Sequence, residues 1–412
     1  MGKTVVIGGG VVGLLSALEL SRRGESVTVL ERGEPGAACS KGNLGWIVPG
    51  LSDPLAAPGL IRTSIRWMLR GDSPLYIHPA ALPRLAGWLW HFWRRCNSSD
   101  YEHGLSALAS LNRTTIDHYE ALSREGVAFE MHRSRLLMVS VNESAVDRAH
   151  EEFDELARVG YERPERLTAE EARALEPALS PAVSGGLLYA EERHVRPETL
   201  CAGVAAHLAT RGVNIRSGGE VSSVERRRDR ITAAVTNEGA IEADRFLIAA
   251  GAWSGVLARQ CGFHLPVQAG KGYSITLEAP AVRVNRPIHF ENPEAACTPY
   301  NGALRVGGTM EFSGINTRLD PRRVAAIRRA AERYLPGIFD SDAGEEWIGM
   351  RPVLPDGLPA IGLAPGFENV YVATGHQMLG ITLAPATAHA IADLITEGRS
   401  ATDLTPFDPG RF

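Results

Sequence analysis

A single arginine stands in a stretch that prolines make stiff, WIGMRPVLPDGLP at positions 347–359. Proline fixes φ and removes a backbone donor, so we expect a rigid, loop-like platform to carry Arg351. A guanidinium presents a planar fork of donors that matches a carboxylate with two parallel hydrogen bonds. The one nearby acid is Asp356. The stretch therefore predicts a binding site for a small carboxylate, with an ion pair between Arg351 and Asp356 as the alternative.

Three further side chains are candidates for the same site. Tyr273 follows a Lys-Gly pair on an expected strand, where it can donate to the same carboxylate or simply be a half-buried sheet tyrosine. Tyr300 is a second phenolic candidate, and His376 either contacts a bound molecule or caps the helix that follows it. No Ser/His/Asp set and no His or Cys spacing typical of a metal site is found. We therefore predict chemistry without a metal.

The N-terminus carries the elements of a nucleotide site. Residues 4–7 (TVVI) form an apolar, β-branched run typical of a buried strand, and G-x-G-x-x-G follows with Gly8, Gly10 and Gly13. A helical pattern comes next, and a second strand closes with Glu31. In a βαβ unit the glycines allow a tight turn, approach of a pyrophosphate and close packing, while the acid binds ribose hydroxyls. This pattern predicts a dinucleotide and disfavours NADP, but it does not separate NAD from FAD.

Composition restricts the class of protein. The chain has 412 residues, a formal net charge of -5 and 44% hydrophobic residues, which indicates a globular protein of two domains that does not bind nucleic acid. Its five cysteines are far apart, which argues against a disulfide framework or structural zinc. A reducing cytoplasm fits this composition.

After residue 50 the parallel α/β pattern does not simply continue, as it would in a plain NAD domain. Residues 60–125 are mostly helical in pattern, while 220–250 contains three β-rich runs that read as an antiparallel meander. We therefore expect an α/β fold in which the domains interleave along the chain. The expected dinucleotide domain is 1–50, 193–265 and 347–412, and the expected substrate domain, built on an antiparallel sheet, is 51–192 and 266–346.

Six ordered motifs span nearly the whole chain. Besides the glycine motif they are SKGNLGWIVPGLSDPLAAPG at 40–59, AAGAWS at 249–254, KGYSIT at 271–276, GMRPVLPDGLP at 349–359 and TGHQMLGIT at 374–382. Together they resemble the D-amino acid oxidase/dehydrogenase superfamily of flavoproteins, most closely its bacterial D-amino acid dehydrogenase branch. The resemblance implies FAD rather than NAD, in a Rossmann-like domain of the glutathione-reductase type.

Carried over residue by residue, the resemblance implies a set of positions around FAD. The residues implied are Gly8, Gly10, Val11, Val12, Gly13, Glu31, Arg32, Ser40, Asn43, Leu44, Gly45, Val221, Ala250, Gly251, Trp253, Gly349, Gly375, Leu379, Gly380, Ile381 and Thr382. The last three should bring a helix N-terminus to the flavin edge, where reduction places negative charge. Arg351 matches the family arginine that binds the substrate carboxylate, and His376 would lie above the flavin.

Two departures from the family pattern matter. Related sarcosine oxidases attach FAD to a cysteine shortly after the Arg351 motif, but no cysteine follows Cys297, so we expect non-covalent FAD. The family's His-Gly-Thr or His-Gly-Gly is here His376-Gln377-Met378, which makes the pocket floor bulkier.

The resemblance implies an FAD-dependent amino acid dehydrogenase or oxidase. Its chemistry would be hydride transfer from Cα to flavin N5, giving an imino acid that hydrolyses to a keto acid and ammonia. D-amino acids are the expected substrates, with D-proline or D-hydroxyproline as a variant. A glycine/sarcosine-type oxidase that makes hydrogen peroxide is the nearest alternative, and a dinucleotide-sensing module without chemistry is the alternative from another class.

The electron acceptor is either oxygen or a quinone, and one segment bears on this choice. In RLAGWLWHFWRRC at 84–96, an apolar helical stripe contains Leu85, Trp88, Leu89, Phe92, Trp93 and Cys96. Trp90 lies off the stripe beside arginines, which is typical of a helix at a membrane surface. A helix that packs inward on the substrate domain is the alternative. The oligomeric state stays open.

Overall fold

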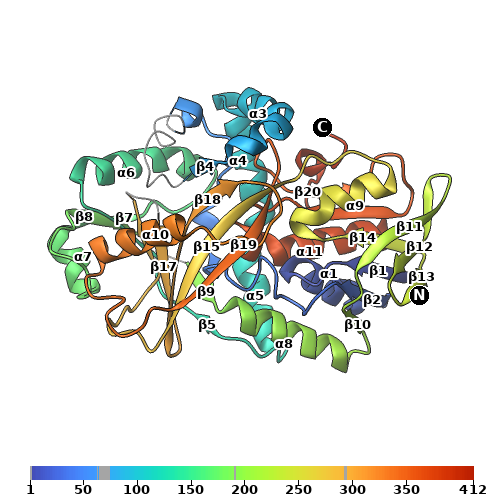
Figure 1. Cartoon of the computed structure of the whole chain (residues 1–412), viewed down its shortest axis with the longest axis horizontal. Helices are drawn as coiled ribbons and strands as arrows, with labels where there is room; N and C mark the ends of the chain where they lie inside the picture. Colours follow the sequence, from blue (N-terminus) through green and yellow to red (C-terminus); the bar gives the residue numbers. More distant parts are fainter. Residues whose placement is uncertain (1, 63, 65–74, 190–191, 292–294) are drawn as a thin grey trace.

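Two large sheets lie side by side in the computed structural model, which describes residues 2–62, 64, 75–189, 192–291 and 295–412. Figure 1 shows the smaller sheet at the right, with α1 and α11, and the larger one at the centre and left. This is the α/β fold with a large antiparallel sheet that the sequence predicted.

The smaller sheet is parallel except at one edge. Its central strand is the apolar run of the sequence, and the antiparallel pair is β20 with β21. In the described part of the chain its strands, in spatial order, are β10 (Asn214–Ser217), β2 (Ser26–Glu31), β1 (Lys3–Ile7), β14 (Arg245–Ile248), β21 (Val370–Thr374) and β20 (Ala360–Leu363). Strands from distant parts of the chain thus meet in one sheet.

Each face of this sheet has its own apolar core. One face is covered by α1 (Val11–Arg22), α11 (Gly380–Glu397), α8 (Pro197–Thr210), α4 (Ser98–Asn112) and α5 (Thr115–Arg124). The other face is covered by α9 (Ser254–Cys261) and the predicted meander, β11 (Val221–Arg227), β12 (Arg230–Thr236) and β13 (Gly239–Glu242). The glycine motif therefore lies at the carboxyl edge of a sheet that is buried on both faces, as dinucleotide sites require.

The larger sheet is mostly antiparallel. Along its path the strands are β19 (Glu345–Val353), β15 (Gln268–Glu278), β18 (Ala303–Phe312), β17 (Ala295–Tyr300), β16 (Ile288–Phe290), β6 (Leu137–Ser140), β8 (Gly185–Leu188) and β7 (Glu165–Thr168), and β4 (Leu75–Ile77) pairs with β18. Helices α10 (Pro321–Tyr334) and α7 (Ala169–Leu175) cover one face, while α6 (Glu143–Arg158) and α3 (Leu82–Arg95) pack on the other. Strand β19 crosses the domain boundary expected at residue 347, because its backbone pairs with β15 up to Val353.

A third, short sheet joins the two halves. It consists of β3 (Trp46–Ile47), β9 (Arg193–Val195) and β5 (Met131–His132). Strand β3 belongs to the first half of the 40–59 motif, so this sheet holds that part of the motif in place.

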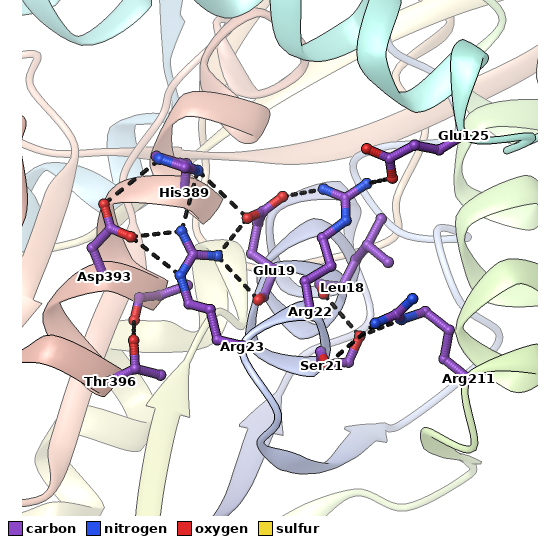
Figure 2. Close-up of polar contacts among 11 residues, drawn as sticks. Leu18, Glu19, Ser21, Arg22, Arg23, Glu125, Arg211, His389, Asp393 and Thr396 are labelled. Atoms are coloured by element: carbon purple, nitrogen blue, oxygen red, sulfur yellow. Dashed lines mark hydrogen bonds and ion pairs between the residues drawn. The ribbon is translucent and has the colours of Figure 1, made fainter.

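Helices α1 and α11 are tied together by partly buried ion pairs (Figure 2). Arg23 bridges Glu19 of its own helix and Asp393 of α11, with Arg23 Nε 3.1 Å from Asp393 Oδ1. Burial alone would raise the pKa of Glu19, but hydrogen bonds from His389 and Arg23 and the nearby arginine charges lower it to about 2. The network lies near the C-terminal ends of α1 and α11, where it holds the two helices against each other.

The tryptophan-rich helix α3 only partly matches its prediction. Leu85, Trp88 and Phe92 are buried, and Trp88 stacks on Phe92 and donates from Nε1 to Pro266 O at 2.9 Å. Trp93, predicted to lie on the same apolar stripe, is 58% exposed, and Trp90 is 49% exposed. The stripe is narrower than the sequence suggested, because the helix touches the sheet along one line of contact. Within the described residues, no helix is long and apolar enough to cross a bilayer.

Candidate active site

A cavity of about 450 Å³ lies at the carboxyl edge of the smaller sheet. Most of the positions implied for the cofactor line it: Gly8, Gly10, Val11, Val12, Glu31, Arg32, Ser40, Asn43, Val221, Ala250, Gly251, Trp253, Gly380 and Ile381. We call it the smaller cavity. Its walls include residues of β1, β2, β11 and the N-termini of α1 and α11, which the fold brings together from three parts of the sequence.

The three motif glycines have different surroundings. A Cβ on Gly13 would lie 1.9 Å from Gly8 O, and a Cβ on Gly8, at φ +115°, would lie 2.5 Å from Ala249 O. Gly13 therefore allows α1 to pack closely on the β1 turn, and Gly8 allows this turn to approach the backbone that follows β14. Gly10 differs, because a Cβ there would meet nothing nearer than Ser40 Oγ at 3.6 Å. The open side of Gly10 faces the cavity, and it leaves room for a pyrophosphate at the helix N-terminus.

The cavity walls also carry groups suited to a nucleotide. Glu31 accepts from Gly9 N at 2.7 Å and from Gly33 N at 2.9 Å, which fixes its carboxylate at the end of β2. The Arg32 guanidinium lies 3.7 Å from the centre of the Trp253 ring. Ser40 Oγ accepts from Val11 N at 3.1 Å and connects the 40–59 motif to α1. These features fit a dinucleotide such as FAD.

A second, larger cavity of about 1060 Å³ adjoins the first. Cys39, Asn43 and Gln377 line both cavities, which places the two side by side. Of the positions implied for the cofactor, Leu44, Gly349, Leu379 and Thr382 line the larger cavity, together with Asn43. The larger cavity also contains Arg351.

The N-terminus of α11 stands where the cavities meet. Gly380 and Ile381 line the smaller cavity, while Leu379 and Thr382 line the larger one. The N–H groups of a first helical turn lack partners within the helix, and they carry partial positive charge. The Thr382 hydroxyl donates to Trp46 O at 3.0 Å and accepts from Val48 N at 3.2 Å, so it attaches the N-terminus of α11 to β3. This arrangement can stabilise negative charge at the junction.

Arg351 extends into the larger cavity from β19. Its Nη1 donates to Thr309 O at 2.7 Å, and within the described residues no carboxylate forms an ion pair with it. Asp356 instead binds Arg411, with Nε 2.7 Å from Oδ2, so the alternative of an Arg351–Asp356 pair is wrong. Burial lowers the pKa of Arg351 and the nearby Cys39 opposes this, but an arginine stays charged at neutral pH. The cavity therefore contains a guanidinium suited to a carboxylate.

Gly272 is the residue that makes room for this guanidinium. A Cβ built on Gly272 would lie 2.3 Å from Arg351 Cζ and 2.4 Å from Nη2. Glycine inside a strand indicates close approach of another group, which was the available signal in KGYSIT. Gly272 was nevertheless not among the site residues predicted from the sequence.

We predict that Gly272→Ala raises KM for the substrate about tenfold, because the guanidinium must move off the strand. Steady-state kinetics with an unchanged FAD content check this expectation. Gly87→Ala on α3 is the control, because the added Cβ would meet nothing within 4 Å. Gly302→Ala is unsuitable, because Gly302 has φ +76° and a substitution there would strain the backbone. An unchanged KM in Gly272→Ala would mean that the arginine is free to shift without loss.

The structure gives Tyr273 and Tyr300 contacts that differ from the predicted contact with a carboxylate. The Tyr273 hydroxyl donates to Glu311 Oε2 at 2.5 Å, and its ring belongs to the apolar cluster under α10. Side chains alternate along a strand, so Tyr273 points away from the face on which Gly272 meets Arg351. Tyr300 is 6% exposed and donates to Leu44 O at 2.9 Å. Neither hydroxyl is directed at a carboxylate on Arg351, and Tyr300 instead holds the 40–59 motif in place.

His376 borders the smaller cavity rather than the larger one. Its Nε2 lies 3.0 Å from Thr387 Oγ1 inside α11, and burial lowers its pKa to about 3. The ring is therefore neutral and structural in this arrangement, which argues against direct contact with a substrate in the larger cavity. Three implied cofactor positions, Gly13, Gly45 and Gly375, line neither cavity. They are packing positions, because a Cβ at each would lie within 2.3 Å of a neighbouring atom.

Comparisons with known proteins agree with this geometry. The model of the family described as "FAD dependent oxidoreductase" (DAO) matches residues 3–394. A D-amino acid dehydrogenase of Chromohalobacter salexigens is 32% identical over 424 aligned positions, covering 100% of this chain and 99% of the relative. One of Methylobacterium nodulans is 33% identical, covering 96% of this chain and 95% of the relative.

Solved structures share the fold. The glycine oxidase of Geobacillus kaustophilus superposes with a TM-score of 0.78 at 24% identity, covering 100% of both chains. The L-proline dehydrogenase of P. horikoshii gives a TM-score of 0.80 at 20% identity, covering 100% of this chain and 97% of the other. With the family match across nearly its whole length, the chain belongs to the DAO family of FAD-dependent oxidoreductases and is an amino acid dehydrogenase or oxidase.

Proposed function

We propose that this enzyme oxidises D-amino acids, with Arg351 binding the substrate carboxylate and FAD held without a covalent bond. The observation that carries the proposal is the Arg351 guanidinium, which lies in the larger cavity with no ion-pair partner among the described residues. The D configuration rests on the relatives that are 32% and 33% identical. A D-proline-type substrate remains within the same proposal.

The residues of this chain supply binding and orientation. Arg351 uses Nη1 to hold Thr309 O, and its remaining N–H groups face the carboxylate. With the carboxylate fixed, the Cα–H is directed to the junction of the two cavities, beside the N-terminus of α11. FAD, when bound, supplies the two-electron oxidant. The positive end of α11 then stabilises the negative charge that reduction creates.

An anaerobic screen of paired D- and L-amino acids tests the substrate class. We expect D-amino acids to bleach the flavin absorbance and their L-enantiomers to do so at least about 100-fold more slowly, since an L-enantiomer held by the same carboxylate anchor presents its Cα–H only with the amine and side chain exchanged. Acid denaturation should release FAD into solution. Bleaching by L-enantiomers or by glycine and sarcosine alone would replace the D-amino acid assignment, and a colourless protein would contradict FAD binding.

The electron acceptor is a separate proposal. The larger cavity is lined by Arg351 and also by Leu82, Leu89 and Trp93 of α3, so its apolar end lies under this helix. Leu82 and Trp93 are also exposed to solvent, and Arg94 lies over the Trp90 ring. An apolar quinone reaching the cavity past a membrane-surface helix fits this arrangement better than oxygen alone.

We therefore expect rapid turnover with a soluble quinone, little hydrogen peroxide in air, and co-sedimentation with anionic liposomes that weakens at high salt. Trp90→Ser, at an exposed residue that does not line the larger cavity, should reduce sedimentation, while flavin reduction by the amino acid stays intact. Stoichiometric peroxide without liposome binding would identify an oxidase with oxygen as its acceptor.

A further inference from the structure

Arg351 lies against an irregular point of the larger sheet. Strands β15 and β18 pair Lys271 with Glu311 and Tyr273 with Gly308, so Gly272 alone opposes both Thr309 and Met310. This is a β-bulge with its extra residue on β18. The carbonyl that accepts from Arg351 Nη1 belongs to Thr309, inside the bulge.

Thr309 is an unfavourable residue for this position. Its φ is +60°, a region that β-branched residues rarely occupy, and its hydroxyl oxygen is buried without a partner among the described residues. Such strain persists only when the surrounding structure holds it, and it concentrates at functional sites.

A single carboxylate, on the face of the larger sheet opposite Arg351, supplies contacts that hold the bulge. Glu311 Oε1 lies 2.9 Å from Lys271 Nζ, and Glu311 Oε2 accepts from the Tyr273 hydroxyl at 2.5 Å. Lys271 and Tyr273 are the two residues that flank Gly272, over which the guanidinium lies. Lys271 Nζ also donates to Asn316 Oδ1 at 3.0 Å and to Arg318 O at 2.8 Å.

The charges of this group are stable. Burial would raise the pKa of Glu311, but hydrogen bonds from Ser313, Tyr273 and Lys271 lower it, so the carboxylate stays ionised. Burial and the contact with Glu311 raise the pKa of Tyr273 well above its usual value, so the phenol stays a donor. Lys271 is 2% exposed and Glu311 is 4% exposed, which makes the pair sensitive to loss of either partner.

We propose that Lys271, Tyr273 and Glu311 form a clamp that holds the strained bulge at Thr309 and thereby positions Arg351. These three are positioning residues, since Glu311 binds Lys271 and the Tyr273 hydroxyl on the face of the sheet opposite Arg351, although Tyr273 itself also lines the larger cavity. The inference rests on the proposed function, because it assigns the clamp to the binding of the substrate carboxylate. It also gives Tyr273 a different role from the direct contact that the sequence predicted.

Tyr273→Phe is the mild test, because it removes one hydrogen bond and leaves the buried ion pair. We expect KM for the amino acid to rise about 5- to 10-fold, with a smaller fall in kcat. The Kd of propionate, a carboxylate without an amine, should rise by a similar factor in titrations of the flavin absorbance. Tyr161→Phe is the matched control, since its hydroxyl donates to Asn112 Oδ1 at 2.6 Å, away from Arg351.

A second substitution separates positioning from direct contact. Glycine enters the left-handed region without strain, so Thr309→Gly lets the bulge persist with a weakened clamp. When Thr309→Gly is added to Tyr273→Phe, we expect KM to be about threefold or more lower than in Tyr273→Phe alone. Ala279→Gly, at another non-glycine residue with positive φ (+56°), should relieve strain without this recovery.

The outcomes decide between the two proposals. If the Tyr273 hydroxyl touched the substrate, Thr309→Gly would give no recovery, and the clamp would be refuted. An unchanged KM and propionate Kd in Tyr273→Phe would refute it as well. If Arg351→Ala itself leaves propionate binding intact, the proposed carboxylate site fails, and that result is distinct from a failure of the clamp alone.

Discussion

Replacing Arg351 by alanine is expected to reduce kcat/KM for the amino acid by about 10²- to 10³-fold while FAD remains bound. The change removes a charge-assisted, bidentate contact whose loss corresponds to roughly 3–4 kcal/mol of transition-state stabilisation. FAD should stay because Arg351 lines only the larger cavity, whereas the nucleotide positions line the smaller one. Steady-state kinetics and the flavin absorbance of the purified variant measure both quantities.

Two further variants test whether the loss in Arg351→Ala comes from the guanidinium itself. Arg351→Lys should recover only part of the loss, because an ammonium group lacks the planar fork and cannot also hold Thr309 O in the same geometry. Arg328→Ala is the matched control, since this arginine of α10 pairs with Glu346 of β19 at 3.0 Å and lines neither cavity. Near-normal kinetics in Arg351→Ala would remove the observation on which the proposed function rests.

The sequence predicted the fold where its patterns were local. The apolar run before Gly8, the glycine spacing and Glu31 predicted β1, the α1 turn and β2, which the structure confirms. The helical pattern of 60–125 corresponds to α3, α4 and α5 in the described part of the chain, and the β-rich runs of 220–250 contain β11, β12 and β13. Each of these depends on a periodicity or a cap that is written in consecutive residues.

The site was predicted less well, because side-chain direction depends on pairing between distant strands. Tyr273 follows Gly272 by one residue, and this single step places its phenol on the opposite face of the sheet from Arg351. The bulge at Thr309 is not visible in GGTMEF, since threonine is an ordinary strand residue and its positive φ follows from register with β15. Asp356 was a sequence neighbour of Arg351, but its partner is Arg411, 55 residues further along the chain.

The cofactor site allows a sharper test than loss of activity, because the three motif glycines differ in what surrounds them. Gly10→Ala should leave the apoprotein folded, since φ is -73° and the new Cβ meets nothing closer than 3.6 Å. The same methyl group would occupy the space of the pyrophosphate at the N-terminus of α1. We expect the Kd of FAD to rise about 100-fold or more, equivalent to ~3 kcal/mol, with the melting temperature of the apoprotein nearly unchanged.

Gly13→Ala and Gly87→Ala are the two controls for Gly10→Ala. At Gly13 the Cβ would lie 1.9 Å from Gly8 O, so the Gly13→Ala apoprotein should be less stable than the wild-type apoprotein, even without FAD. Gly87→Ala adds a methyl group on α3 with nothing within 4 Å, so it should change neither the FAD Kd nor the melting temperature of the apoprotein by much. Fluorescence titration of the apoproteins with FAD gives the affinities, and differential scanning calorimetry gives the stabilities. Tight FAD binding by Gly10→Ala would place the pyrophosphate elsewhere and overturn the assignment of the smaller cavity, because its open side at Gly10 is the feature that distinguishes a binding glycine from a packing one.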